Sequence, residues 1–182
     1  QINRYARESF WAGEGMFDYI QIFVISNGTE TKYYSNTTRY GREKEADEQK
    51  GKKTKKKTQS NSFEFTSYWS DAENHLICDL EDFAHTFLTK RTLLNILTRY
   101  CVLNTDGDLL VMRPYQIAAT EKITGRIKQA LLNHWQGTRK AGGYIWHTTG
   151  SGKTLTSFKT AQIASKMEEI YKVVFVVDRQ DL

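Results

Sequence analysis

The sequence is 182 residues long and 39% of its residues are hydrophobic, which is enough for one buried core or for parts of two domains. Six lysines lie between positions 50 and 57, and without these six the formal net charge of +5 becomes −1. The charge is therefore no evidence for a basic nucleic-acid-binding surface, and the longest apolar runs, 22–25 and 173–177, are far too short to span a bilayer.

The N-terminal part predicts a helix followed by a hairpin. Apolar residues recur at helical spacing over 1–10. The β-branched and aromatic runs 19–25 and 31–34 then flank Asn27-Gly28, a pair that predicts a two-residue type I′ turn with two positive φ angles. Because the chain starts with Gln1 instead of Met and stops just after an apolar run, we expect it to be a piece of a longer protein.

A polar stretch and two helices are expected next. The stretch 38–60 is rich in Glu, Lys and Gln, so we expect a disordered surface insertion. Order resumes at 63–69, and amphipathic helices follow at 79–88 and 93–100. The acids Asp79, Glu81 and Asp82 with His85 suggest a metal site, but stabilisation of a helix N-terminus explains them better.

The C-terminal third predicts a parallel α/β sheet. A strand at 109–112 precedes Pro114, which suits the first turn of a helix reaching about residue 135. The order strand 143–146, Gly-rich loop, helix 153–166 and strand 172–178 predicts a sheet that begins near residue 140. Trp146 and Phe158 are expected to pack in its core. Cys78 and Cys101 lack metal-ligand spacing, so we expect free thiols in a reducing cytosol.

The strongest chemical signal is the loop HTTGSGKT at 147–154. A turn of this kind points successive backbone N–H groups at the phosphates of a nucleotide. Glycines at two positions remove the Cβ atoms that would block this approach, a lysine supplies charge for the β and γ phosphates, and a hydroxyl holds Mg²⁺. The residues assigned to this site are Thr149, Gly150, Ser151, Gly152, Lys153 and Thr154.

Two features qualify and extend the motif. His147 stands where the general phosphate-loop pattern has Gly, but Thr-x-Gly-Ser-Gly-Lys-Thr is the form found in superfamily 2 helicases. Upstream, Gln116 is suited to pair with the N6 and N7 edge of adenine, and Tyr115 or Arg113 to stack on the base. This stretch resembles the adenine-recognising Q motif of the same helicases; its alternative interpretation is an ordinary helix start.

These stretches together resemble the restriction (R) subunit of type I restriction enzymes. The resemblance rests on RPYQIAAT at 113–120, GYIWHTTGSGKTLTSF at 143–158, VVFVVDRQD at 173–181 and the hairpin with FVISNGT at 23–29. It implies an α/β fold: the C-terminal part of an N-terminal nuclease domain over 1–90, a connecting segment over 91–112, and the start of a RecA-like ATP-binding motor over 113–182. Gln1 and Tyr5 match a Q-x-x-x-Y pattern that supports the active site in this nuclease family.

The resemblance also implies cofactors, partners and a location. The cofactors are ATP and Mg²⁺, the latter held by Thr154 through the nucleotide. The partners are double-stranded DNA and the methyltransferase (modification) and specificity subunits, and the location is the cytoplasm of a bacterium or an archaeon. Since no Asp…Glu-x-Lys constellation precedes Gln1, and no Asp-Glu-x-His box or arginine finger follows the phosphate loop, we expect this piece alone neither to cut DNA nor to hydrolyse ATP efficiently.

Two alternatives remain open at this point. The first is another superfamily 2 helicase or remodelling ATPase without a nuclease, against which the hairpin and the Q-x-x-x-Y pattern argue. The second is a non-catalytic nucleic-acid-binding module centred on the lysine run. That run has no interleaved aromatic residues and lies beside acidic ones, so a solvated insertion is the simpler interpretation.

Overall fold

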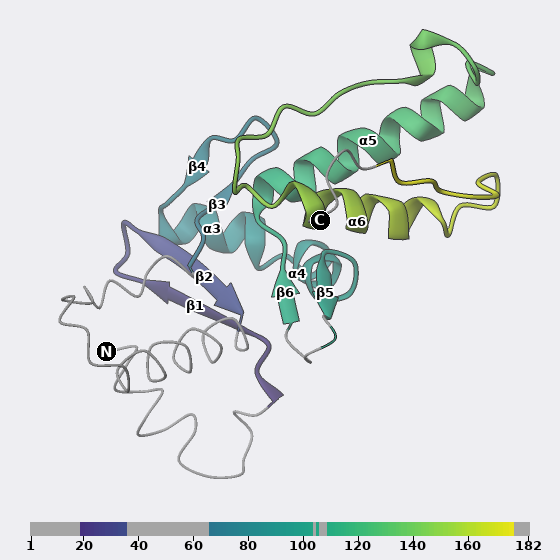
Figure 1. Ribbon diagram of the computed structural model, residues 1–182. Coiled ribbons are helices and arrows are strands. Elements are labelled where there is room, and N and C mark those ends of the chain that lie inside the picture. Colours follow the sequence, from purple (N-terminus) through teal and green to yellow (C-terminus); the bar gives the residue numbers. More distant parts are fainter. Residues whose placement is uncertain (1–18, 36–65, 104, 106–108, 177–182) are drawn as a thin grey trace, which may run out of the picture.

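The computed structural model describes residues 19–35, 66–103, 105 and 109–176 (Figure 1). The helix expected at 1–10, with Gln1 and Tyr5, and the insertion expected at 38–60 lie outside the described residues. The described elements, in chain order, are β1 (Ile22–Ser26), β2 (Thr31–Ser35), β3 (Trp69–Ser70), β4 (Leu76–Ile77), α3 (Leu80–Phe87), α4 (Lys90–Thr98), β5 (Cys101–Leu103), β6 (Leu109–Val111), α5 (Pro114–Leu132), η3 (Arg139–Ala141) and α6 (Lys153–Ala164).

The predicted hairpin is confirmed, but its turn is not type I′. Strands β1 and β2 pair antiparallel with Ser26 opposite Thr31, which leaves a four-residue loop. Gly28 has φ +100°, whereas Asn27 does not have a positive φ. Instead, the Asn27 side-chain oxygen accepts hydrogen bonds from the backbone N–H groups of Thr29 and Glu30, at 3.2 and 2.7 Å. The Asn side chain therefore closes the turn by capping backbone donors, a common alternative for this residue.

Capping residues fix the starts of α3 and α4. The Asp79 carboxylate accepts from the backbone N–H groups of Glu81 and Asp82, at 2.8 and 3.4 Å, and Thr89 accepts from the N–H of Thr92 at 3.2 Å. Both side chains satisfy donors that a helix start leaves without a partner. The interpretation of the acidic cluster as a helix N-terminus is thereby confirmed.

One aromatic core joins the hairpin to the helices. Tyr33, Phe83, Phe87 and Ile96 are buried together, with Phe83 and Phe87 stacked at a centroid distance of 4.6 Å and Tyr33 at 4.8 Å from Phe87. Burial raises the pKa of the Tyr33 hydroxyl, which donates a hydrogen bond to the carbonyl of Met112 at 3.4 Å. The hairpin and the strand that leads into α5 therefore belong to one packed unit.

Helices α5 and α6 lie side by side (Figure 1), with threonines between them. Thr120 and Thr160 are buried, and their hydroxyls approach to 3.4 Å. The hydroxyls of Thr124 and Thr160 also donate to carbonyls one turn earlier in their own helices, at 2.9 and 2.7 Å. These bonds satisfy polar groups that would be costly to bury alone, so the small side chains let the two helices approach closely.

The expected parallel sheet is not present among the described residues. The three sheets in this part of the chain are two-stranded and antiparallel, and residues 143–146 and 172–176 are not strands. The expected core positions are also wrong, since Trp146 is 88% and Phe158 48% exposed. A strand needs a neighbour to receive its backbone hydrogen bonds, and neither run has a neighbouring strand within the described ranges.

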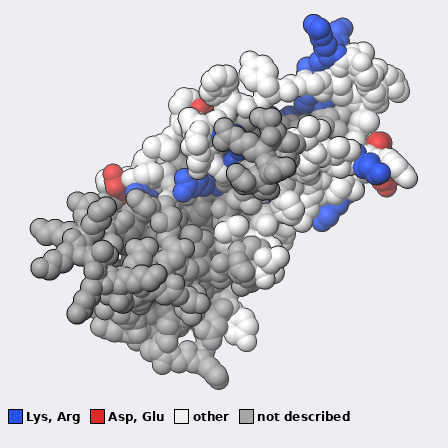
Figure 2. Space-filling view, viewed as in Figure 1, with Lys and Arg blue, Asp and Glu red and all other residues white. Residues whose placement is uncertain are grey.

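The distribution of charged side chains on the surface agrees with the interpretation that the net charge is no evidence for a basic nucleic-acid-binding surface. On the face in Figure 2, basic side chains form separate patches over the described part of the chain, with acidic side chains among them. Cys78 and Cys101 are free thiols, as expected, and burial raises the pKa of Cys101. No helix within the described residues is long and apolar enough to cross a membrane.

Candidate nucleotide-binding site

The predicted phosphate loop is folded back on itself ahead of α6. The carbonyl of Thr148 accepts three hydrogen bonds: from the Ser151 N–H at 3.4 Å, from the Ser151 hydroxyl at 2.7 Å and from the Lys153 ammonium at 3.0 Å. Gly150 and Gly152 both have φ +77°, in the left-handed region that side chains disfavour. The two glycines therefore make the reversal possible, and the lysine closes it.

The start of α6 presents free backbone donors. Gly152 is the N-cap and no side chain caps the helix; the first helical bond runs from the Thr156 N–H to the Gly152 carbonyl at 3.1 Å. The amides of the first turn and the positive end of the helix dipole are therefore available to an anion. Lys153, Thr154 and Thr149 are exposed around this end, so the donor set fits the phosphates of a nucleotide.

The structure brings Gln116 into direct contact with the loop. Its side chain is 4% exposed; its oxygen accepts from the Arg113 N–H at 2.8 Å, while its nitrogen donates to the carbonyls of Ser151 at 3.1 Å and Gly152 at 3.3 Å. A Cβ at Gly152 would overlap the Gln116 amide nitrogen. Gln116 thus binds the phosphate loop itself, 36 residues downstream, and both ends of its amide are engaged.

Tyr115 is a second link between α5 and the loop. Its hydroxyl donates to the Ser151 carbonyl at 2.9 Å, and its ring meets that of His147 edge-on at a centroid distance of 5.8 Å. The residues that the sequence assigned to base recognition therefore hold the loop from one side. His147, which stands where the general motif has Gly, therefore packs against the Tyr115 ring.

Sequence reasoning missed the contribution of the upstream hairpin to this site. A hollow of about 240 Å³ is bordered by Gln116, Gly152 and Leu155 and also by Tyr34 and Ser35 of β2. Nothing in the local sequence of β2 signals this placement, because it arises from the shared core around Tyr33. The hairpin and the phosphate loop consequently face a common space.

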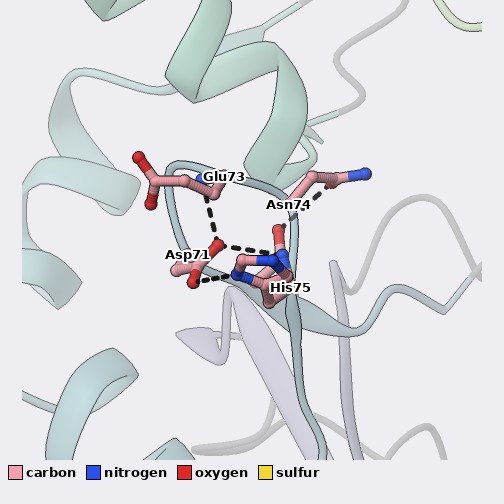
Figure 3. Close-up of polar contacts among 5 residues, drawn as sticks. Asp71, Glu73, Asn74 and His75 are labelled. Atoms are coloured by element: carbon pink, nitrogen blue, oxygen red, sulfur yellow. Dashed lines mark hydrogen bonds and ion pairs between the residues drawn. The ribbon is translucent and has the colours of Figure 1, made fainter.

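A tight turn between β3 and β4 borders a larger hollow of about 720 Å³ beside the loop. In this turn (Figure 3) the Asp71 carboxylate accepts from the N–H groups of His75 and Glu73, at 2.8 and 3.0 Å, and contacts the His75 ring nitrogen at 2.9 Å. The His75 backbone bond, first among these contacts, lowers the pKa of Asp71. Asn74 has φ +71°. The turn therefore forms one rim of this hollow, and its Asp71 carboxylate is already hydrogen-bonded within the turn.

Two protein-family models match the two ends of the chain. The family model described as SWI2/SNF2 ATPase matches residues 115–182, and the family model described as type I restriction enzyme R protein N terminus matches residues 1–42. The predicted phosphate loop and the helix that follows it therefore lie within the segment that matches the SWI2/SNF2 ATPase model.

Relatives extend the match across the whole chain. A type I restriction enzyme endonuclease subunit from Staphylococcus aureus (strain COL) is 40% identical over 183 residues, covering 100% of this chain and 16% of the relative. The EcoprrI endonuclease subunit from Escherichia coli is 48% identical over 133 residues, covering 73% of this chain and 37% of the relative. The C-terminal part of a putative endonuclease subunit, MpnIIP, from Mycoplasma pneumoniae is 54% identical over 115 residues, 63% and 56% of the two chains.

The chain is homologous to the endonuclease subunits of type I restriction enzymes, which confirms the resemblance inferred from its motifs. It spans 16% of the length of the Staphylococcus aureus relative.

Proposed function

We propose that this chain supplies the ATP-binding loop of a type I restriction endonuclease subunit, which moves along double-stranded DNA by hydrolysing ATP and cuts it with an Mg²⁺-dependent nuclease. The observation that carries the proposal is the uncapped start of α6 behind a loop with two left-handed glycines, together with the homology. The methyltransferase and specificity subunits are the proposed partners, and the cytoplasm of a bacterium or an archaeon is the proposed location.

In this proposal Lys153 and Thr154 hold the phosphate end of the nucleotide. The Lys153 ammonium already lies in the loop, 3.0 Å from the Thr148 carbonyl, and exchanging this carbonyl for phosphate oxygens gives a stronger bond because both partners are then charged. The exposed Thr154 hydroxyl is the proposed ligand for Mg²⁺, and the loop and first-turn amides of Thr149 to Thr154 donate to the phosphates. ATP supplies the phosphoryl group whose transfer to water drives movement.

The base is proposed to bind beside Gln116, Tyr115 and Arg113. Gln116 makes three bonds to the backbone, so adenine readout requires its amide to exchange at least one of them for a bond to the base. The 240 Å³ hollow lies next to this amide and beside Gly152 and Leu155. We therefore assign the adenine to this hollow, where binding of the base would directly change the hydrogen bonds of Gln116, a residue that holds the phosphate loop.

The division of the chain is proposed as the nuclease domain over 1–90, a connecting segment over 91–112 and a RecA-like motor over 113–182. Residues 143–146 and 172–178 are proposed to become strands of the motor sheet once neighbouring strands receive their backbone bonds. Gln1 and Tyr5 are proposed to support the nuclease site. These assignments rest on the family resemblance and on the order of the motifs.

The test is Lys153→Ala in the intact subunit assembled with its partners. Translocation and cleavage should both be abolished, because cleavage depends on movement, whereas Lys140→Ala, an exposed lysine of η3, should leave both unchanged. Continued ATP-driven translocation by Lys153→Ala would overturn the proposal. Translocation without cleavage by the parent protein would favour a superfamily 2 ATPase that lacks a nuclease.

A further inference from the structure

A basic cleft lies where the C-terminal end of α4 meets α5 and α6. It has a volume of about 380 Å³ and is lined by four basic side chains: Arg99, Lys128, Lys159 and Lys166. No acidic side chain lines it. These cations come from separate parts of the chain, so the fold, and not a local run of lysines, gathers them.

Lys159 is the most unusual of the four. It is 6% exposed, and its ammonium donates to the Cys101 carbonyl at 2.8 Å and to the Gln162 side-chain oxygen at 2.7 Å. No carboxylate lies within ion-pair distance of it among the described residues. An ammonium has three donors, and these two bonds leave one. Burying such a charge without an anion is unfavourable.

The surroundings of Lys159 intensify this need for an anion. Burial lowers the pKa of Lys159; the neighbouring Cys101 thiol partly opposes this shift, and the positive charges of Lys166 and Arg99 add to it. Arg99 is itself only partly neutralised: its guanidinium is 3.5 Å from the Glu121 carboxylate, while its Nε is buried without a hydrogen-bond partner, the one such side-chain atom in the described part of the chain. The cleft thus combines excess positive charge with unused donors.

We propose that this cleft binds a phosphate group of the DNA backbone, as a sequence-independent contact separate from the nucleotide site. A phosphate oxygen accepts the charge-assisted bonds that these lysines and Arg99 offer. The contact would sit on α6, the helix that begins at the phosphate loop. The inference rests on the proposed DNA-motor function, because it takes duplex DNA to be the polyanion present.

The basic cleft is bounded on one side by a hollow that contains an acidic residue. An adjoining hollow shares Lys128 and Met167 with the cleft but contains Glu169, whose carboxylate would repel phosphate. Lys128 and Lys166 are the exposed members of the set. They can therefore be removed with little disturbance to packing, unlike Lys159, which fixes α6 to β5.

The experiment compares two double variants of the intact subunit. Lys128→Ala/Lys166→Ala removes the exposed cations of the cleft, and Lys90→Ala/Lys140→Ala removes two exposed lysines elsewhere. Affinity for a short duplex is measured without nucleotide across a salt series. The slope of log affinity against log salt changes by about 0.9 for each phosphate that is no longer neutralised. Because the cleft is proposed to hold one phosphate, we expect the cleft variant to lose about 0.9 of slope and the control to keep the parent slope.

The outcomes distinguish a failure of the cleft proposal from a failure of the proposed motor function. A cleft variant with the slope of the parent overturns this inference and leaves the proposed motor intact. A parent subunit that binds no duplex overturns both. Phosphorus NMR with inorganic phosphate distinguishes the source of the anion: if the cleft variant loses phosphate binding but keeps the DNA slope, the cleft holds free phosphate and the DNA contact is wrong.

Discussion

Gly152→Ala tests how α5 holds the phosphate loop. Alanine at φ +77° costs about 1–2 kcal/mol in the left-handed region. Its Cβ would also displace the Gln116 amide, and the two hydrogen bonds from that amide to the loop contribute about 1 kcal/mol each. The total is about 3–4 kcal/mol of local stability lost at the start of α6.

Gly150→Ala is the matched control, because Gly150 has the same φ but nothing lies within 4 Å of an added Cβ. Hydrogen exchange at the amides of 156–160 reports local opening of α6. Since about 1.4 kcal/mol is tenfold, exchange should be about tenfold to thirtyfold faster in Gly152→Ala than in Gly150→Ala. This difference should vanish when Gln116→Ala is added to both; equal exchange in the two single variants would refute the reasoning.

Three further predictions follow from the described contacts. Tyr115→Phe removes the hydroxyl bond to the loop, worth about 1 kcal/mol, and in the intact subunit should raise KM for ATP several-fold with little change in kcat. The same rise in Tyr144→Phe, a residue that is 89% exposed, would argue against a specific role of the Tyr115 hydroxyl. Phe87→Ala should cost about 3–5 kcal/mol in denaturant unfolding, and a cost below 1 kcal/mol would contradict the shared core. Because the folded pKa of Asp71 is lowered, its contribution to stability is present above the unfolded pKa and is lost as pH falls through the folded pKa. Asp71→Asn should lack this loss when the free energy of unfolding is measured against pH. If the free energy of unfolding of Asp71→Asn falls at acid pH as it does in the parent, this contribution of Asp71 is excluded.

Local signals in the sequence predict most of the helices well. Pro114 marks the start of α5, Asp79 caps α3, and the glycines at 150 and 152 precede α6, because each acts on neighbouring backbone groups. The turn after β1 shows the limit of such signals. Asn27-Gly28 is compatible both with a type I′ turn and with side-chain capping, and the strand register decides between them.

Features that depend on distant partners could not be predicted in the same way. The run 143–146 has the composition of a buried strand, but its pairing depends on neighbours and not on its own residues, and Trp146 stays exposed. Gln116 was assigned to adenine from its motif, whereas its bonds to Ser151 and Gly152 emerge only when α5 and the loop are packed together. The basic cleft is likewise not visible in the sequence, because Arg99 and Lys128 are far along the chain from Lys159 and Lys166.

The most direct test of the central claim is the affinity of the intact subunit for ATP, ADP and AMP with Mg²⁺, measured by calorimetry for the parent and for Lys153→Ala. A hydrogen bond to a charged group contributes about 1.5–3 kcal/mol, so we predict that ATP and ADP bind the variant about tenfold to a hundredfold more weakly, while AMP changes little. Equal ATP affinity in the parent and the variant would contradict the assignment of this loop as the nucleotide phosphate site.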